Sequence, residues 1–201
     1  MGTTTILDII GALVIGGIMM ASLHSVNQNV LTNMYYYNSD IINQSNLVSV
    51  VDFLERDIKR LGYSSDPALL PTPAKSILVA DTSRIKFAGD IDNNGVIDTV
   101  TYYIGPLSDL ASTPNPRDRI LYRRIDPGAR VTPNPGVTEF SLLFFDALSD
   151  TLPLPLPASE TGRIAAIQIS VRVESANSVD EQYALAFWRQ IRVSARNLKN
   201  R

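Results

Sequence analysis

A long apolar segment lies close to the N-terminus. The run from Ile9 to Leu23 has the sequence IIGALVIGGIMMASL, without a charged residue, and together with Ile6 and Leu7 it is interrupted only by Asp8. A membrane-spanning helix needs about 20 predominantly apolar residues, so the segment is close to the required length. A cleavable secretory signal begins with a basic region, whereas no Lys or Arg precedes Arg56. We therefore predict that residues 1–25 are the transmembrane part of a longer helix.

The next stretch has the periodicity of an amphipathic helix. Apolar residues between Asn27 and Leu61 recur at steps of three and four on a background of Asn, Gln and Ser. Glu55 and Lys59 form an i,i+4 pair, and Gly62 stands where a left-handed cap can end a helix. Residues 26–62 are thus predicted to be the amphipathic part of the same helix, ending near Leu61. The apolar positions are Val30, Met34, Tyr37, Ile41, Leu47 or Val48, Val51, Leu54, Ile58 and Leu61.

The remaining residues, 63–201, are predicted to form a β-rich globular head. All 12 prolines lie there, and short β-branched runs are separated by loops rich in Pro, Asn, Ser and Asp. In the run that ends at Val173, apolar and polar residues alternate, which is typical of an antiparallel strand with one face in water. The predicted strands are Arg84–Phe87, Thr99–Ile104, Ile120–Arg123, Glu139–Phe145, Ile164–Val173 and Ala184–Val193.

These parts together predict an α+β fold. A long N-terminal helix, transmembrane at first and amphipathic afterwards, is expected to pack its second half on the dry face of a mostly antiparallel β-sheet. The PLPLP run at residues 153–157 is expected to be extended and irregular.

Charge and composition exclude several classes of function. The net charge of -2 gives no concentrated basic surface for phosphates, so no nucleic-acid partner is expected. The chain has no cysteine and one histidine, His24, which removes thiolate metal ligands and the commonest general base. Because no combination of acid, base and nucleophile is visible, we expect that the protein is not an enzyme.

One loop has the spacing of a calcium-binding loop. Residues 90–98, DIDNNGVID, place oxygen-bearing side chains at positions one, three, five and nine, a glycine at six and a backbone carbonyl at seven, as in the first nine positions of an EF-hand loop. Calcium takes six to eight oxygen ligands, and this loop supplies about five of them. The predicted metal ligands are Asp90, Asp92, Asn94, the carbonyl of Val96 and Asp98.

A simpler interpretation of the same loop stays open. The closing Glu is missing, because Thr101 stands at position twelve, and the flanks have the pattern of strands rather than helices. The alternative is a β-hairpin with a turn at Asn94 and Gly95, where positive φ is needed, and with solvated aspartates.

The N-terminal pattern and the helix end carry a family resemblance. Residues 53–63, FLERDIKRLGY, resemble the helix end of minor pilins of the PilW type and of type II secretion pseudopilin J, in which an L-x-R-D-(I/L)-(K/R)-x-x-G-Y run leads into the head. The apolar segment that follows Asp8 is similar to the first helix of type IV pilins and pseudopilins, and residues 188–197 are similar to their last strand. The sequence departs from the family at Thr3, where an aromatic residue or Met is usual, and at Asp8, where Glu is usual.

The resemblance implies a structural subunit. Such a protein has one span in the cytoplasmic membrane and an extracytoplasmic head, and joins or primes a type IV pilus or a secretion pseudopilus at the cell surface or in the periplasm. The implied partners are the cytoplasmic membrane and other pilin-like subunits in a homo- or hetero-oligomeric filament. The alternative is a membrane-anchored binding or adhesion module that does not polymerise.

Five residues of the apolar segment are candidate assembly residues. The resemblance implies that Asp8 docks each subunit against its neighbour, and the alternative is an interfacial carboxylate at a helix start. Two pairs of small residues spaced by four would let another helix approach closely. They are Ala12 with Gly16, and Gly17 with Ala21.

Overall fold

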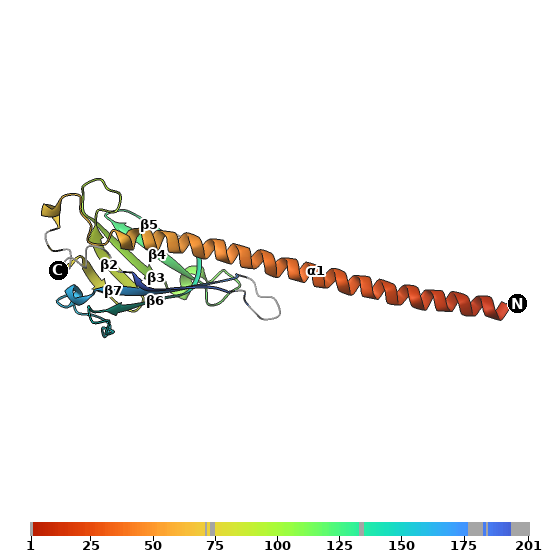
Figure 1. Ribbon diagram of the computed structural model, residues 1–201. Helices are drawn as coiled ribbons and strands as arrows, with labels where there is room; N and C mark the ends of the chain where they lie inside the picture. The colour runs from red at the N-terminus through yellow and green to blue at the C-terminus, as the bar shows by residue number, and fades with distance from the viewer. Residues whose placement is uncertain are drawn as a thin grey trace. The chain divides into compact units, whose positions relative to one another are not determined.

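The computed structural model describes residues 2–70, 72, 75–132, 135–176, 183 and 185–193. It divides into two compact units, Met1–Ile41 and Ile42–Arg201. Helix α1 (Gly2–Lys59) supplies the first unit and continues into the second, where it is followed by the strands (Figure 1). Ala184 and residues 194–197, which belong to the predicted last strand and to the family resemblance, lie outside the described residues.

The second unit is built on one antiparallel sheet. Its strands run in the order β1-β2-β3-β4-β6-β7-β8, with β5 paired to β4, and every pair is antiparallel. The predicted α+β class is therefore confirmed. The strands are β1 (Ile77–Ala80), β2 (Arg84–Gly89), β3 (Asp98–Ile104), β4 (Arg119–Asp126), β5 (Arg130–Val131), β6 (Pro135–Phe145), β7 (Ala166–Glu174) and β8 (Leu185–Val193), and the short 3-10 helices are η1 (Pro67–Leu69), η3 (Leu107–Leu110) and η4 (Thr161–Arg163).

The C-terminal part of α1 forms one side of the core of the head. Leu47, Val50, Leu54 and Ile58 are buried at steps of three and four, and they belong to one hydrophobic cluster with the inward-facing residues of the sheet. Each such side chain contributes about 1.5–3 kcal/mol when it is removed from water. The sheet side of the cluster includes Ile85, Phe87, Val100, Tyr102, Leu121, Phe140, Leu142, Ile167, Ile169 and Val171.

The predicted apolar series on the helix agrees with the structure in its last turns. Leu54, Ile58 and Leu61 are fully buried, Leu47 rather than Val48 enters the core, and Val51 is half-buried. The earlier members of the series, which lie in the first unit, are exposed: Val30, Met34, Tyr37 and Ile41.

All six predicted strands are present, although the fifth begins at Ala166 rather than Ile164. Two strands were missed. β1 has four residues and β5 has two, too few for an alternating pattern to be distinguished from a loop. The PLPLP run is irregular as predicted, yet Leu152 and Leu156 are buried and Leu154 packs against the core.

The prediction that β7 has one face in water is wrong for three of its four polar residues. Gln168, Ser170 and Glu174 are buried, whereas the side chain of Arg172 is 43% exposed. β7 is an interior strand between β6 and β8, and the segment before β4 contacts its last residue, Glu174. Asn115 Nδ2 donates to Glu174 Oε2 at 3.2 Å, and Arg117 forms an ion pair with the same oxygen at 2.8 Å. Glu174, at the end of this face, is thus satisfied within the protein rather than by solvent.

Candidate functional site

The end of α1 is joined to the loop that follows β2. The helix ends at Lys59, and Gly62 has a φ of 69°, as expected for the predicted left-handed cap. The amide of Gly62 donates to the carbonyl of Ala88 at 2.9 Å, and that of Asp90 donates to the carbonyl of Tyr63 at 2.8 Å. A Cβ on Gly89 would overlap the carbonyl oxygen of Arg60, so only glycine permits this close approach.

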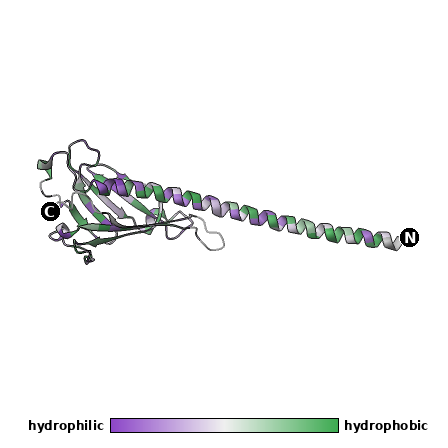
Figure 2. Cartoon of the chain, viewed as in Figure 1, coloured by the Kyte–Doolittle hydropathy of each residue, from purple (hydrophilic) through white to green (hydrophobic). Residues whose placement is uncertain are grey.

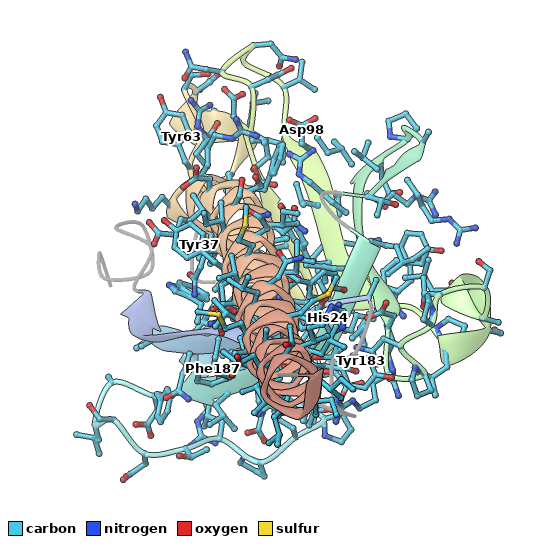
Figure 3. The ribbon with its side chains drawn as sticks, turned by 90° about the vertical axis from the view of Figure 1, so that its right-hand side faces the viewer. His24, Tyr37, Tyr63, Asp98, Tyr183 and Phe187 are labelled. Atoms are coloured by element: carbon cyan, nitrogen blue, oxygen red, sulfur yellow. The ribbon has the colours of Figure 1, made fainter. Side chains whose placement is uncertain are left out.

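A side chain at the helix end also reaches the same loop. Arg60 donates from Nη1 to the carbonyl of Ile91 at 2.7 Å, and the hydroxyl of Tyr63 donates to Asn93 Oδ1 at 3.2 Å. Tyr63 and Asp98 therefore lie at one end of the head (Figure 3). The 63–65 segment and the 90–98 loop form one structural unit, although they are separate in sequence.

The loop brings three carboxylates together. Asp90, Asp92 and Asp98 each offer one oxygen, and these three atoms lie within 4.8 Å of one another. Asp90 is buried, Asp92 is exposed, and Asp98 is intermediate. The three predicted carboxylate ligands are therefore arranged so that they could hold a metal ion, and their donor set consists of hard oxygens.

Asp90 organises the loop. Its Oδ1 accepts the amide of Asn94 at 3.0 Å, and its Oδ2 accepts the amide of Gly95 at 3.1 Å and the hydroxyl of Ser65 at 3.0 Å. Burial raises the pKa of Asp90, but the hydrogen bonds from Ser65 and from backbone amides outweigh it, so the pKa lies below its usual value. The carboxylate is thus kept ionised by donors that stabilise its charge.

The other predicted ligands take part in the same loop. Asp98 Oδ2 accepts the amide of Ile91 at 3.2 Å, and Asn94 Nδ2 donates to Asp92 Oδ2 at 2.9 Å. Asn94 Oδ1 accepts the amide of Val96 at 2.7 Å, so this oxygen caps the turn. Ser65 was not predicted, because nothing in the sequence connects it to a loop 25 residues away.

The simple hairpin alternative differs from the observed loop. Gly89 and Asp98 are the last paired residues of β2 and β3, and eight residues, 90–97, connect them. A two-residue turn at Asn94 and Gly95 would need positive φ at both, whereas the positive values occur at Asn93 (65°) and Gly95 (83°). The flanking strands are as predicted. Thr101 is buried within β3, so it is no closing ligand.

A buried ionic cluster connects α1 with the sheet. Asp57 is completely buried, and its Oδ2 accepts Nε of Arg123 at 2.6 Å and the hydroxyl of Tyr102 at 2.7 Å. Arg123 Nε also lies 3.1 Å from the hydroxyl of Tyr102. This role of Asp57 was not predicted. Two features of the sequence could have indicated that Asp57 is buried. It belongs to the pilin-like motif of residues 53–63, and it lies three residues after Leu54, on the same side of the helix.

This cluster shifts the pKa values of its members. Burial and the negative charge of Asp57 raise the pKa of Tyr102 well above its usual value. Burial lowers the pKa of Arg123, but the hydrogen bond and charge of Asp57 outweigh this effect and raise it. At neutral pH, Tyr102 is therefore a neutral phenol and Arg123 is a cation.

No protein-family model matches the chain, and no curated protein matches its sequence. The structure supports a pilin-like arrangement at the level of architecture: one long, apolar N-terminal helix followed by an antiparallel sheet.

The N-terminal part of α1 is the only helix in the described chain that is long and apolar enough to cross a membrane. Figure 2 shows hydrophobic residues along it. Its large side chains are exposed, for example Leu13 at 71% and Met20 at 76%. The predicted assembly residues Asp8, Ala12, Gly16, Gly17 and Ala21 all lie in this helical segment and are exposed. A Cβ added at Gly16 or Gly17 would meet no atom within 4 Å.

Proposed function

We propose that this protein is a membrane-anchored, pilin-like structural subunit that joins or primes a type IV pilus or a secretion pseudopilus. One observation carries the proposal: a single helix has two different surfaces along its length. Residues 47–58 contribute four core side chains to the head, whereas the large apolar side chains of residues 5–41 are exposed in the part of the chain that the structure describes. A helix of this kind is suited to be both an anchor and a structural element of the head.

The exposed apolar surface needs an environment other than water. Ile9, Leu13, Ile18 and Met20 are between 57% and 76% exposed, on a segment without Lys or Arg. Large contiguous apolar surfaces mark membrane or protein interfaces, because their transfer out of water is favourable. In the proposal, this segment lies in the cytoplasmic membrane before assembly and packs against neighbouring subunits afterwards.

The small residues supply two packing surfaces on this segment. With about 100° of rotation per residue, the pair Ala12 and Gly16 lies about 140° around the helix axis from the pair Gly17 and Ala21. A subunit inside a helical filament contacts neighbours on more than one side, and small residues let helix backbones approach closely. Asp8, which precedes these pairs, would be the polar docking group of the same surface.

Bulky substitutions on these surfaces test the proposal. Gly16→Leu and Gly17→Leu keep the segment apolar, so membrane insertion should persist, while close helix packing is lost. We expect the abundance in sheared filaments, relative to the membrane fraction of the same cells, to fall at least tenfold for each variant. Ile18→Leu, on the side of the helix between Ala21 and Asp8, is the matched control and should incorporate normally. Normal incorporation of both glycine variants would overturn the packing model.

Calcium is the proposed ligand of the 90–98 loop. Support comes from the three converging carboxylates, from the ionised state of Asp90 and from a donor set made entirely of oxygen. The hydroxyl of Ser65, 3.0 Å from Asp90 Oδ2, and water would complete a coordination number of six to eight. Because Arg60 and Tyr63 bind this loop, calcium would stabilise the junction between the helix end and the head.

The proposal assigns no catalytic activity to the protein. The absence of cysteine and the single histidine of the chain support a structural role. The head would act as the surface that the filament displays.

A further inference from the structure

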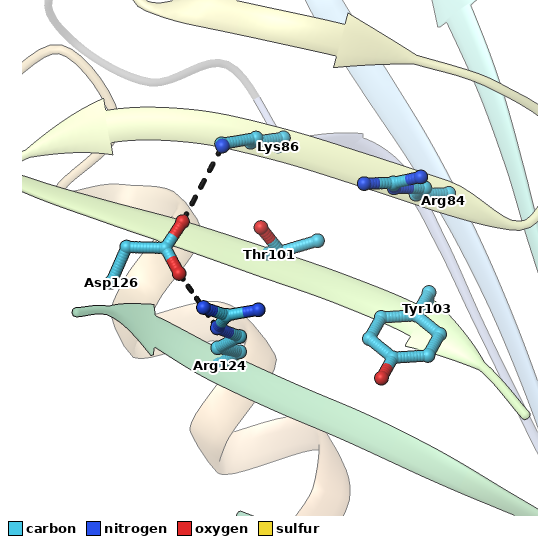
Figure 4. Close-up of a pocket in the computed structure, with 6 residues that line it drawn as sticks. All are labelled: Arg84, Lys86, Thr101, Tyr103, Arg124 and Asp126. Carbon is cyan, nitrogen blue, oxygen red and sulfur yellow. Dashed lines mark ion pairs between the residues drawn. The ribbon is translucent and has the colours of Figure 1, made fainter. Parts of the chain in front are cut away.

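The outer face of the sheet carries a row of cations. Along β2, Ile85 and Phe87 point into the core, so Arg84 and Lys86 lie on the opposite face. The register places Lys86 opposite Thr101 on β3, and Thr101 opposite Arg124 on β4. Residues that are far apart in the sequence thereby form one continuous polar surface across three strands (Figure 4).

This surface encloses a pocket of about 220 Å³. A cavity needs only about 10–15 Å³ to hold one water molecule, so a polyatomic ion and its water molecules can enter this pocket. Thr101 is buried, and the side chains of Lys86 and Asp126 are each 30% exposed, so the pocket is partly desolvated. The lining residues are Arg84, Lys86, Thr101, Tyr103, Arg124 and Asp126.

The pocket has an excess of positive charge. Its one carboxylate, Asp126, pairs with Lys86 at 3.4 Å through Oδ2 and with Arg124 at 2.7 Å through Oδ1. Arg84 adds a third cation, and no ion pair of Arg84 is found within the part of the chain that the structure describes. The pocket thus has two positive charges more than negative ones, in a chain whose net charge is -2.

A fixed aromatic wall closes one side of the pocket. The ring of Tyr103 lies 5.2 Å from that of Tyr122, and Arg130 lies over Tyr122 at 5.4 Å. Arg130 Nη1 donates to the hydroxyl oxygen of Tyr103 at 3.2 Å. Because Tyr103 accepts this bond, its own O–H remains a donor that can be directed toward an anion.

We propose that this pocket binds an oxyanion with two negative charges, either a phosphate group or a pair of carboxylates. Arg84 supplies a guanidinium fork that matches two oxygens of such a group. Lys86 and Arg124 supply further donors, and the hydroxyl of Tyr103 completes the site. Asp126 holds the two paired cations in place and at the same time weakens the attraction by its own charge. The inference is independent of the proposed filament function.

Calorimetric titration of the full chain in detergent micelles tests this inference. The probes are inorganic phosphate and succinate, in a buffer of low ionic strength because salt screens such interactions. Arg84→Gln should weaken binding at least tenfold. Asp126→Asn should strengthen binding several-fold, because it removes the negative charge of the pocket. A misfolded variant would instead bind more weakly. Arg163→Gln, at an exposed arginine of η4 paired with Glu160, is the control and should bind like the wild type.

The outcomes separate the two sources of the oxyanion. Binding of phosphate alone assigns the pocket to phosphate groups, and binding of succinate alone assigns it to carboxylates; binding of both supports the shared oxyanion chemistry. The inference is overturned if neither probe releases more heat than its dilution, or if Arg163→Gln weakens binding as much as Arg84→Gln.

Discussion

Asp57 on α1 and Arg123 on β4 form a buried ion pair, with Oδ2 and Nε 2.6 Å apart. The side chain of Asp57 is 0% exposed and that of Arg123 11%. The hydroxyl of Tyr102 on β3 donates to the same carboxylate oxygen at 2.7 Å. The helix is thus joined to two strands by charge as well as by apolar contacts, and this geometry fixes its register against the sheet.

Removal of the cation should strongly destabilise the head. Arg123→Met removes the close cation of a buried carboxylate and leaves it only the 3.9 Å contact with Arg56 and the hydrogen bond from Tyr102. Loss of one partner of a buried ion pair typically costs about 3–5 kcal/mol. Urea unfolding of the full chain in detergent, followed by the fluorescence of Trp188, the single tryptophan, measures the loss. Arg124→Met, on the outer face of the same strand and 49% exposed, is the control and should cost at most about 1 kcal/mol. Equal losses for the two variants would contradict the role given to Asp57.

The stability of the head should fall at alkaline pH because of Tyr102. Its pKa is raised in the folded protein, mainly by burial and by the charge of Asp57, above the value of about 10 of a free tyrosine. The folded state therefore holds the phenolic proton more tightly than the unfolded state does. The contribution of protonated Tyr102 to the free energy of unfolding is therefore fully present below about pH 10, and it is lost as the pH rises through the pKa of the folded state.

Tyr102→Phe is expected to flatten this alkaline decline, although it also lowers stability at neutral pH by the loss of a hydrogen bond. The readout is the free energy of unfolding at a series of pH values between about 8 and 11. Tyr103→Phe, the next residue on the opposite face of β3, is the control. An alkaline slope that is unchanged in Tyr102→Phe would show that other groups determine it.

The α+β class could be predicted because long elements have strong patterns. The helix end before Gly62 and strands such as β6 follow from periodicity and turn chemistry, and the three carboxylates of one short loop follow from their spacing. What could not be predicted depends on contacts between distant residues. Ser65 meets Asp90 across 25 positions, and Arg123 meets Asp57 across 66. Asn115 and Arg117 meet Glu174 at the end of β7 from a segment whose path no local pattern specifies.

Calcium should stabilise the wild-type head. Binding only to the folded state adds about 2.7 kcal/mol when the free ion is at 100 times its Kd, so the thermal midpoint should rise as calcium is added. Asp92→Asn, at the exposed ligand, should abolish this rise with little effect on stability in chelator. Asp81→Asn, in the turn between β1 and β2, should keep the full response. A midpoint that calcium does not change in the wild type would rule out the metal site.

Replacement of Asp118 by asparagine should stabilise the protein at neutral pH. Asp118 is buried, its Oδ1 has no hydrogen-bond partner among the described residues, and burial, with the charge of Glu174, raises its pKa. A raised carboxyl pKa means that the folded state binds the proton more tightly, so stability decreases as the pH rises from about 4 through the folded pKa. The neutral amide of Asp118→Asn avoids this loss.

The advantage of Asp118→Asn should therefore be largest at pH 7 and should shrink as the solution is acidified. Denaturant unfolding at pH 7 and at pH 4 measures it, with the exposed Asp150→Asn as the control. A variant less stable than the wild type at pH 7 would show that the negative charge of Asp118 is favourable.

Quantitative mass spectrometry of the native cells tests whether the N-terminal helix is an assembly helix. The abundance of this chain is compared between sheared surface or periplasmic filaments and the membrane fraction, together with its N-terminal peptide in each. We predict that the chain is found in both fractions and co-purifies with other pilin-like subunits. A chain that remains wholly in the membrane while filaments form and retain their other subunits would contradict the account.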